Sequence, residues 1–211
     1  MYRRHFLSLV AGLVFAIALL GPGPGARAGS LEEKAQQYIE DLSGQAIKSL
    51  TAKGLTRDER IKRFRTMFKE RFAVRGIGKW ILGRYWKKAT PKERKDYLKL
   101  FEDLMVISYV DRFATYAGEQ LQTTKTLPNN KTTVTVYTEI AQPDAGPPVR
   151  VDWRVGVKGD ILKVVDVVVE GTSMSSTLRS DFGSIIRREG GSIAGLIKAL
   201  REKTTSLRKQ L

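Results

Sequence analysis

The sequence predicts an α+β fold in which long amphipathic helices lie on one face of an antiparallel sheet of about four strands, enclosing an apolar cavity. Two changes of hydrophobic period support this prediction. Apolar residues recur at spacings of three and four between residues 30 and 116, and then alternate with polar residues between residues 121 and 170. Helical spacing returns after residue 171, so helices flank a run of consecutive strands.

Two amphipathic helices are predicted near the start of this pattern. The first spans residues 30–50 and gathers its apolar side chains on one stripe. The second begins at a capping box at residues 56–59 and aligns Phe64, Phe68 and Phe72 along one face.

A break and a third helix follow. The glycines in the run 75–78 predict the end of the second helix, and a short apolar piece follows at residues 80–82. Thr90 and Glu93 form another capping box, with Pro91 at the first helical position. From this start we expect the longest helix of the chain, reaching to about residue 116.

Four strands are predicted from the alternating pattern. They cover residues 120–127, 131–140, 151–157 and 161–170, and turn residues separate them. The last two strands are joined by a tight turn at residues 158–160. In the fourth strand, Ile161, Val165, Val167 and Val169 are expected on one face, with Asp166 and Glu170 on the other.

Two helices are predicted after the strands. Thr172 or Ser173 caps the first of them, in which Leu178, Phe182 and Ile186 share one face. The final helix is expected over residues 192–210.

Three blocks of sequence carry a resemblance to a known family. Two are the segments 82–91 and 147–152. The third consists of Val164, Asp166, Val169, Glu170, Gly171, Ser173, Arg179 and Phe182. In residue type, order and separation these blocks resemble the signature of the MlaC, or toluene-tolerance, family of periplasmic phospholipid-binding proteins, and together they cover nearly all of the chain after residue 28.

The resemblance implies an NTF2-like core wrapped by extra helices, and a carrier of phospholipid. Family members shuttle lipid between an outer-membrane lipoprotein complex and an inner-membrane ABC transporter complex, which maintains outer-membrane lipid asymmetry. Some relatives are associated with hopanoid lipids, so that cargo stays an alternative. An NTF2-like enzyme and a periplasmic adaptor that binds no lipid are the alternatives from other classes.

Residues 1–28 are expected to form an export signal. Arg3 and Arg4 precede an apolar run, and the sequence Ala26-Arg27-Ala28 is typical of a cleavage site. The remaining residues, 29–211, are enough for one domain with a sizeable core, which we expect to be periplasmic and monomeric.

The composition disfavours an enzyme. The chain has no Cys, and its single His, His5, lies in the expected signal. We therefore expect no metal, no cofactor and no catalytic triad. Asp166 and Glu170 form the one acid pair considered as a general acid and base, but a solvent-facing surface or ion pairs with Arg150, Arg154 or Arg179 explain them better.

Positive charge is concentrated in one part of the chain. Fifteen Lys and Arg residues and only four acidic residues fall between positions 57 and 95. We interpret Arg84, Lys87 and Lys88 as a docking surface for anionic headgroups or an acidic partner, with transient membrane contact. A solvated, solubilising face is the alternative, and an exported protein is not expected to bind nucleic acid.

A carrier of acyl chains needs an apolar pocket, which this sequence offers between its sheet and its helices. We expect a cavity of several hundred Å³, the usual size of a ligand site. Its expected walls are Val134, Val136, Trp153, Val155, Val165 and Val167 on the sheet and Phe68, Phe101, Leu104 and Ile107 on the helices.

Overall fold

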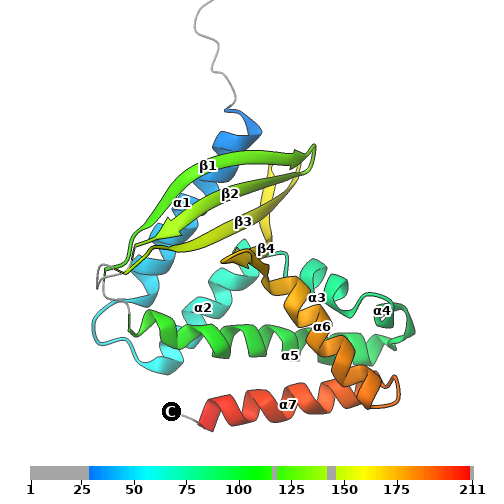
Figure 1. Ribbon diagram of the computed structural model, residues 1–211. Helices are drawn as coiled ribbons and strands as arrows, with labels where there is room; N and C mark the ends of the chain where they lie inside the picture. Colours follow the sequence, from blue (N-terminus) through cyan, green and yellow to red (C-terminus); the bar gives the residue numbers. More distant parts are fainter. Residues whose placement is uncertain (1–28, 116–117, 142–145, 210–211) are drawn as a thin grey trace, which may run out of the picture.

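A five-stranded antiparallel sheet lies over a layer of helices, which confirms the predicted α+β class (Figure 1). The computed structural model describes residues 29–115, 118–141 and 146–209. The export signal expected at residues 1–28 lies outside the described residues.

Along the described chain, a block of helices is followed by a block of strands and then by two more helices, as the sequence pattern predicts. The helices before the sheet are α1 (Leu31–Leu50), α2 (Arg57–Arg71), α3 (Val74–Leu82), α4 (Tyr85–Lys88), α5 (Pro91–Tyr109) and the 3₁₀ turn η1 (Val110–Phe113). The strands are β1 (Leu121–Asn130), β2 (Thr133–Ile140), β3 (Val149–Lys158), β4 (Ile161–Val169) and β5 (Thr172–Ser173), and two helices follow, α6 (Met174–Arg188) and α7 (Ile193–Lys209).

Side-chain caps start the long helices where the sequence predicts them. The Thr56 hydroxyl accepts from the backbone N–H of Glu59, and the Glu59 carboxylate accepts from the backbone N–H of Thr56. Thr90 and Glu93 form the same reciprocal pair at the start of α5. These bonds satisfy amide groups that have no partner inside a helix.

The predicted helix break at residues 75–78 is wrong. α3 runs through these residues, and the chain leaves α2 one turn earlier, at Phe72. There Phe72 forms a parallel bridge with Val164 of β4, and the backbone N–H of Ala73 donates to the Val164 carbonyl at 2.9 Å. A contact with a strand that is distant in sequence therefore ends α2, and local glycine content does not.

Gly78 has a packing role inside α3. A Cβ atom at this position would lie 2.8 Å from Cδ2 of Leu98 and 3.4 Å from Cδ1 of Phe101. The Tyr97 hydroxyl donates to the Gly78 carbonyl at 3.0 Å. The missing side chain thus lets α3 approach α5 closely.

The helix expected to reach residue 116 is shorter than predicted. α5 ends at Tyr109 after 19 residues, and the tighter turn η1 replaces its continuation. α1, with 20 residues, is therefore longer than α5.

The sheet is a meander in which each strand pairs with its sequence neighbours, in the order β1-β2-β3-β4-β5. β5 is a two-residue addition to the four strands predicted, and its pairing with β4 leads directly into α6. α1 packs against one face of β1 and β2, and it lies behind these strands in Figure 1. We call this face of the sheet the inner face and the opposite one the outer face.

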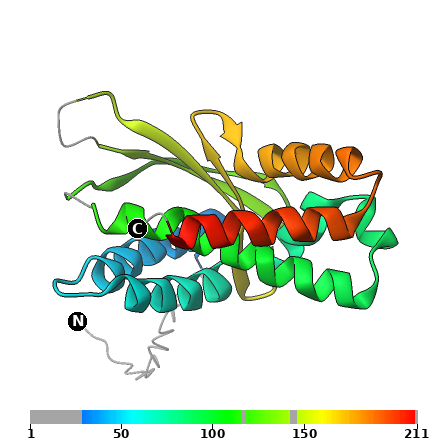
Figure 2. The same cartoon turned by 90° about the horizontal axis from the view of Figure 1, so that it is seen from below.

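Two apolar cores fill the interior. The first lies between the inner face, α1 and α2, and the second lies among α3, α4, α5, α6 and α7. Val74 and Met105 are partly buried and pack against both cores. In Figure 2 the helical layer, with α5 and α7 running side by side, extends well beyond the sheet. The second core occupies this extension, so the two cores meet rather than merge.

Candidate functional site

The layer between the inner face and α2 is the best candidate for an apolar binding site. Val134, Val136 and Val155 have no exposed surface, and Phe68 packs in the same core. Trp153 and Val167 are partly buried against it. Six of the ten predicted pocket residues therefore lie together. Alternation on β2 and β3 places four of them on one face, where Val134 pairs with Val155 and Val136 with Trp153.

An aromatic row on the helical side faces these valines. Phe64, Phe68 and Phe72 recur every four residues on and just after α2, so they share one side of the helix. Ring centroids are 6.3 Å apart for Phe64 and Phe68 and 4.8 Å apart for Phe68 and Phe72. Phe113 of η1 extends the row, with its centroid 5.3 Å from that of Phe64.

The predicted face of β4 is corrected by a β-bulge. Val155 pairs with Val164 and Arg154 pairs with Asp166, so Val165 is an extra residue with no partner on β3. Val164, fully buried, therefore takes the inner position that we expected for Val165. A Cβ at Gly156 would lie 2.8 Å from Cγ1 of Val165, so the glycine makes room for the displaced side chain.

The predicted helical wall on α5 is also wrong in part. Phe101 and Leu104 belong to the second core, and Ile107 is buried on the same helix. Val106 and Val110 pack in the first core instead. α5 is apolar on two sides because it lies between the two cores, and the sequence period does not say which side meets the sheet.

The layer where the cavity is expected is buried, since Val134, Val136 and Val155 have no exposed surface. Two open hollows are found on the surface that the described residues form, and neither is lined by a predicted pocket residue. One, of about 590 Å³, lies along α7 and is lined by Arg201, Glu202, Thr205, Ser206 and Lys209. The other, of about 370 Å³, is lined by Tyr38, Glu70, Arg71, Asp160, Ile161, Leu162 and Lys163.

The smaller hollow adjoins the apolar layer. Tyr38 and Leu162 line it and also pack against the first core. The Tyr38 hydroxyl donates to the Arg71 carbonyl at 2.8 Å, and the Arg71 guanidinium lies 5.2 Å from the Tyr38 ring centroid. Two bonds to Gln45 Oε1, at 3.1 and 2.9 Å, hold that guanidinium in place. Burial raises the pKa of the Tyr38 hydroxyl, which therefore stays neutral.

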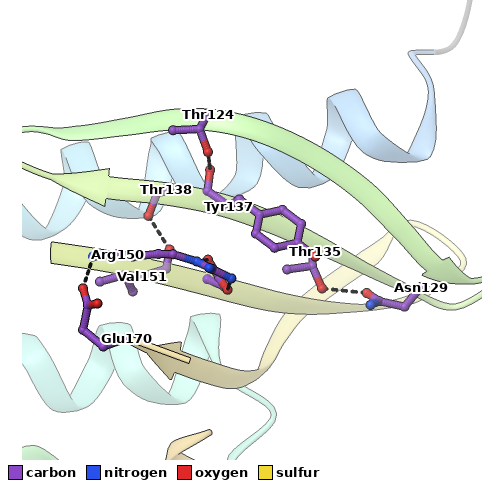
Figure 3. Close-up of polar contacts among 9 residues, drawn as sticks. Thr124, Asn129, Thr135, Tyr137, Thr138, Arg150, Val151 and Glu170 are labelled. Carbon is purple, nitrogen blue, oxygen red and sulfur yellow. Dashed lines mark hydrogen bonds and ion pairs between the residues drawn. The ribbon is translucent and has the colours of Figure 1, made fainter. Parts of the chain in front are cut away.

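The outer face of the sheet is polar (Figure 3). The Tyr137 ring has Lys125 Nζ 4.5 Å and the Arg150 guanidinium 5.7 Å from its centroid. Arg150 donates to both carboxylate oxygens of Asp152, at 3.0 and 2.7 Å. This bidentate pair raises the pKa of the Arg150 guanidinium.

The carboxylates of Asp166 and Glu170, the acid pair considered as a general acid and base, both accept hydrogen bonds from neighbouring residues. Asp166 is buried and accepts from Arg154 Nη1 at 3.0 Å, from the Ser173 hydroxyl at 2.6 Å and from the Ser175 amide at 3.1 Å. The interpretation of Asp166 as an ion-pair partner is thereby confirmed. Glu170 lies beyond the end of β4, and its Oε1 accepts from the Arg150 amide at 2.5 Å (Figure 3).

Two further kinds of site are not found in the described part of the chain. It contains no cluster of three or more His, Cys, Asp or Glu side chains that suits a metal ion. None of its helices is long and apolar enough to cross a membrane.

Comparison with known proteins places this fold in a family. A family profile described as MlaC protein matches residues 40–202, most of the chain. The chain belongs to the MlaC family. Among solved structures, it is similar to the phospholipid-binding protein from Ralstonia solanacearum in complex with a phospholipid. That match has a TM-score of 0.74 and 22% identity and covers 83% of this chain and 99% of the Ralstonia chain. At this identity the likeness establishes a shared fold.

The predicted docking residues of this MlaC-family chain lie at the end of the helical layer farther from β1. Arg84 precedes α4, Lys87 and Lys88 belong to it, and all three are exposed. Tyr85 and Trp86 beside them are buried in the second core.

Sequence reasoning did not predict that Trp80 is exposed or that it contacts Arg179. Trp80 belongs to the predicted apolar piece, yet 48% of it is exposed, while Ile81 and Leu82 are 2% exposed each. The Arg179 guanidinium of α6 lies 4.7 Å from the Trp80 ring centroid. A helical projection of residues 74–82 would have separated Trp80 from its apolar neighbours, but nothing local predicts the contact with α6.

Proposed function

We propose that this MlaC-family protein binds phospholipid and carries it through the periplasm. The observation that carries the proposal is its family membership, supported by a relative of the same fold that holds a phospholipid. Residues 40–202, which match the family, contain the strands of the inner face, α2 and every lining residue of the smaller hollow except Tyr38.

The apolar layer provides what acyl chains need. Removing a methylene group from water is worth about 0.8 kcal/mol, so two chains of ordinary length amount to about 20 kcal/mol. A carrier must replace the bilayer with a surface of similar polarity, and no catalytic step is required. We place the acyl chains between the inner-face valines and the aromatic row of α2, with Val164 in the position expected for Val165.

Binding at this place requires the layer to open. The rings of Phe64, Phe68 and Phe72 now fill the space that the chains would take. Phe72 and Ala73 attach the end of α2 to β4, so opening is easiest away from that attachment. Rotation of the phenylalanine side chains and a small separation of sheet and helices would exchange one apolar contact for another.

The smaller hollow is suited to the phospholipid headgroup. Arg71 and Lys163 supply positive charge there beside the acidic Glu70 and Asp160, as a zwitterionic headgroup requires. Tyr38 and Leu162 connect the hollow to the apolar layer. Arg71 is held by Gln45 and Tyr38, so its guanidinium is positioned before a phosphate arrives. Replacing Arg71 by Gln is expected to lower the amount of bound lipid without changing its acyl-chain lengths.

The family resemblance supports transfer between an outer-membrane lipoprotein complex and an inner-membrane ABC transporter complex. The test of cargo is organic extraction of the purified protein followed by mass spectrometry. Co-purified phospholipid is the expected result, whereas a polycyclic triterpenoid would favour a hopanoid carrier. An empty extract from protein prepared without detergent would contradict lipid carriage.

A further inference from the structure

Trp80 lies exposed on α3 in contact with a cation from α6. Besides the ring contact, Arg179 Nη1 donates to the Trp80 carbonyl at 3.0 Å. Gly83, in a left-handed conformation with φ 52°, makes room for this arrangement, since a Cβ there would lie 2.9 Å from Arg179 Nη2. The indole is therefore held on the surface with a guanidinium beside it.

Further positive charges gather next to this pair. Arg84 Nη2 donates to the Tyr85 hydroxyl at 3.2 Å, and its guanidinium lies 5.1 Å from the Tyr85 ring centroid. The pKa of that hydroxyl is lowered, first by the bond to Arg84 and also by the charges of Arg84, Arg187 and Lys88. Side chains from α4 and α6 thus bring their charges to one place.

This cluster has little acidic compensation. Residues 71–92 contain no Asp or Glu, and on α6 and its end only Asp181 and Glu189 oppose the basic residues. Within the described residues, no ion pair involves Arg84, Lys87, Lys88, Arg179 or Arg187. α3, α4 and α6 lie together at one end of the helical layer in both Figure 1 and Figure 2.

We propose that this end of the molecule, formed by α3, α4 and α6, docks on the surface of an anionic bilayer, with the Trp80 indole at headgroup level. Indole rings favour the membrane interface because one part is apolar and another carries a hydrogen-bond donor. Lys and Arg side chains around it attract anionic headgroups. We take a bilayer as the occupant because an interfacial indole ringed by cations matches both the apolar and the anionic parts of its headgroup region, and binding to an acidic protein is the alternative outcome of the test.

This inference rests on the proposed function, because a lipid carrier has a reason to approach a bilayer. The docking end is distinct from the apolar layer, which lies in the first core, whereas α4 and α6 pack in the second. Loss of docking therefore need not remove cargo.

The test uses the exported form of the protein and two kinds of vesicle, one neutral and one with about one third phosphatidylglycerol. We expect sedimentation with the anionic vesicles only, together with a blue shift of tryptophan emission. Reversal of Arg84, Lys87 and Lys88 to Glu should weaken binding to the anionic vesicles by at least about fivefold for each residue reversed. Trp80→Ala should weaken it several-fold and abolish the emission shift.

A matched control separates the docking surface from net charge. Lys53, Lys131 and Lys203 are exposed and lie on other parts of the molecule, and reversing them changes the total charge equally. If this control weakens vesicle binding as much as the α4 reversal does, or if Trp80→Ala has no effect, the proposal is overturned. Binding only to an acidic protein would overturn it as well.

Lipid extraction from the same samples keeps the two proposals apart. Docking variants with normal bound phospholipid and lost vesicle binding support the inference. A wild-type protein that contains phospholipid but ignores anionic vesicles overturns the docking surface and leaves the carrier function standing. A wild-type protein without lipid contradicts the carrier function, whatever the vesicles show.

Discussion

Asp166 shows how partners determine the role of a single side chain. Its carboxylate accepts from Arg154, Ser173 and Ser175, so it joins β3, β4 and the start of α6. A buried carboxylate without such donors is strongly disfavoured. Asp166→Asn weakens the bonds from Arg154, Ser173 and Ser175, so we expect it to lower the free energy of unfolding, measured by urea denaturation. Lipid extraction should find the same amount of bound phospholipid as in the wild type.

A charge in the inner face should remove cargo. Val167→Glu places a carboxylate at a partly buried position in the apolar layer, where an unpaired charge costs several kcal/mol. We expect extraction to find little or no phospholipid in this variant, and Val136→Glu should act in the same way. Circular dichroism must show that the variants are folded.

Leu127→Glu is the matched control for this charge. Leu127 also lies on a strand, but it is 46% exposed. It should therefore retain normal lipid. Folded Val167→Glu protein with a full complement of lipid would contradict the proposed site, and loss of lipid in Leu127→Glu would show that the effect is not local.

Because of Tyr97, the free energy of unfolding should fall as the pH becomes alkaline. Burial raises its pKa above the ordinary value of 10.0, so the folded state keeps a proton that the unfolded state loses. The stabilisation is complete below pH 10 and declines as pH rises above it, by up to about 1.4 kcal/mol per pH unit.

Tyr97→Phe isolates this effect. At neutral pH the variant should be about 1 kcal/mol less stable, because the bond to the Gly78 carbonyl is lost. The difference should shrink above pH 10, since only the wild type has the titrating hydroxyl. Urea unfolding curves from pH about 7 to about 11 measure it. Two curves that stay parallel would contradict the raised pKa.

At the scale of elements, α3 is a helix in a glycine-rich segment. Gly76 lies within it, and a Cβ there would meet only Ala73 Cβ, at 3.7 Å. Gly83 follows the helix in a left-handed conformation that glycine adopts most easily. The two glycines therefore have opposite requirements although they are seven residues apart.

Alanine at these positions tests the helix. Gly76→Ala should raise the free energy of unfolding by about 0.5–1 kcal/mol, because alanine favours helix and reduces the freedom of the unfolded chain. Gly83→Ala should lower it by about 1 kcal/mol or more, through backbone strain and contact with Arg179. Urea denaturation measures both, and a destabilised Gly76→Ala protein would contradict a helix through residues 75–78.

The edge strand β1 bears features that hinder pairing with a second copy. Register shifts interrupt its pairing with β2 near Thr124 and Asn129. Pro128 lacks an amide donor, and Lys125 brings a charge to the strand. Charges, prolines and bulges at an edge oppose sheet-to-sheet association.

For the whole molecule, bound lipid should contribute to stability. A ligand present at about one hundred times its dissociation constant adds about 2.7 kcal/mol to the folded state. For a domain of this size that corresponds to a Tm shift of about 5–10 °C. We therefore expect delipidated protein to melt earlier by this amount, and to recover when phospholipid is returned.

The Val167→Glu variant provides the reference for this experiment. Because it should hold no lipid in its apolar layer, its Tm should not respond to delipidation or to added phospholipid. Calorimetry of both proteins, each with and without added phospholipid, measures the two Tm shifts. An equal response in both proteins would mean that the lipid acts outside the proposed layer.

Local sequence determined the order of helices and strands, the caps of α2 and α5 and the inner faces of β2 and β3. Capping boxes and hydrophobic period act over a few residues, so they can be read without a fold. The alternation that put Val134, Val136 and Val155 on one face was correct for the same reason. The family resemblance added the expected cargo, which period and composition alone do not specify.

Tertiary structure alone decided what depends on contacts between distant segments. The bulge at Val165 arises from the pairing of β3 with β4, and α2 ends where Phe72 meets Val164. Both sides of α5 are apolar, so only packing assigns Phe101 to the second core. Trp80 is exposed because α3 turns its neighbours inward and α6 supplies Arg179 from 99 residues away. Such contacts form only when the whole chain packs, and no local period encodes them.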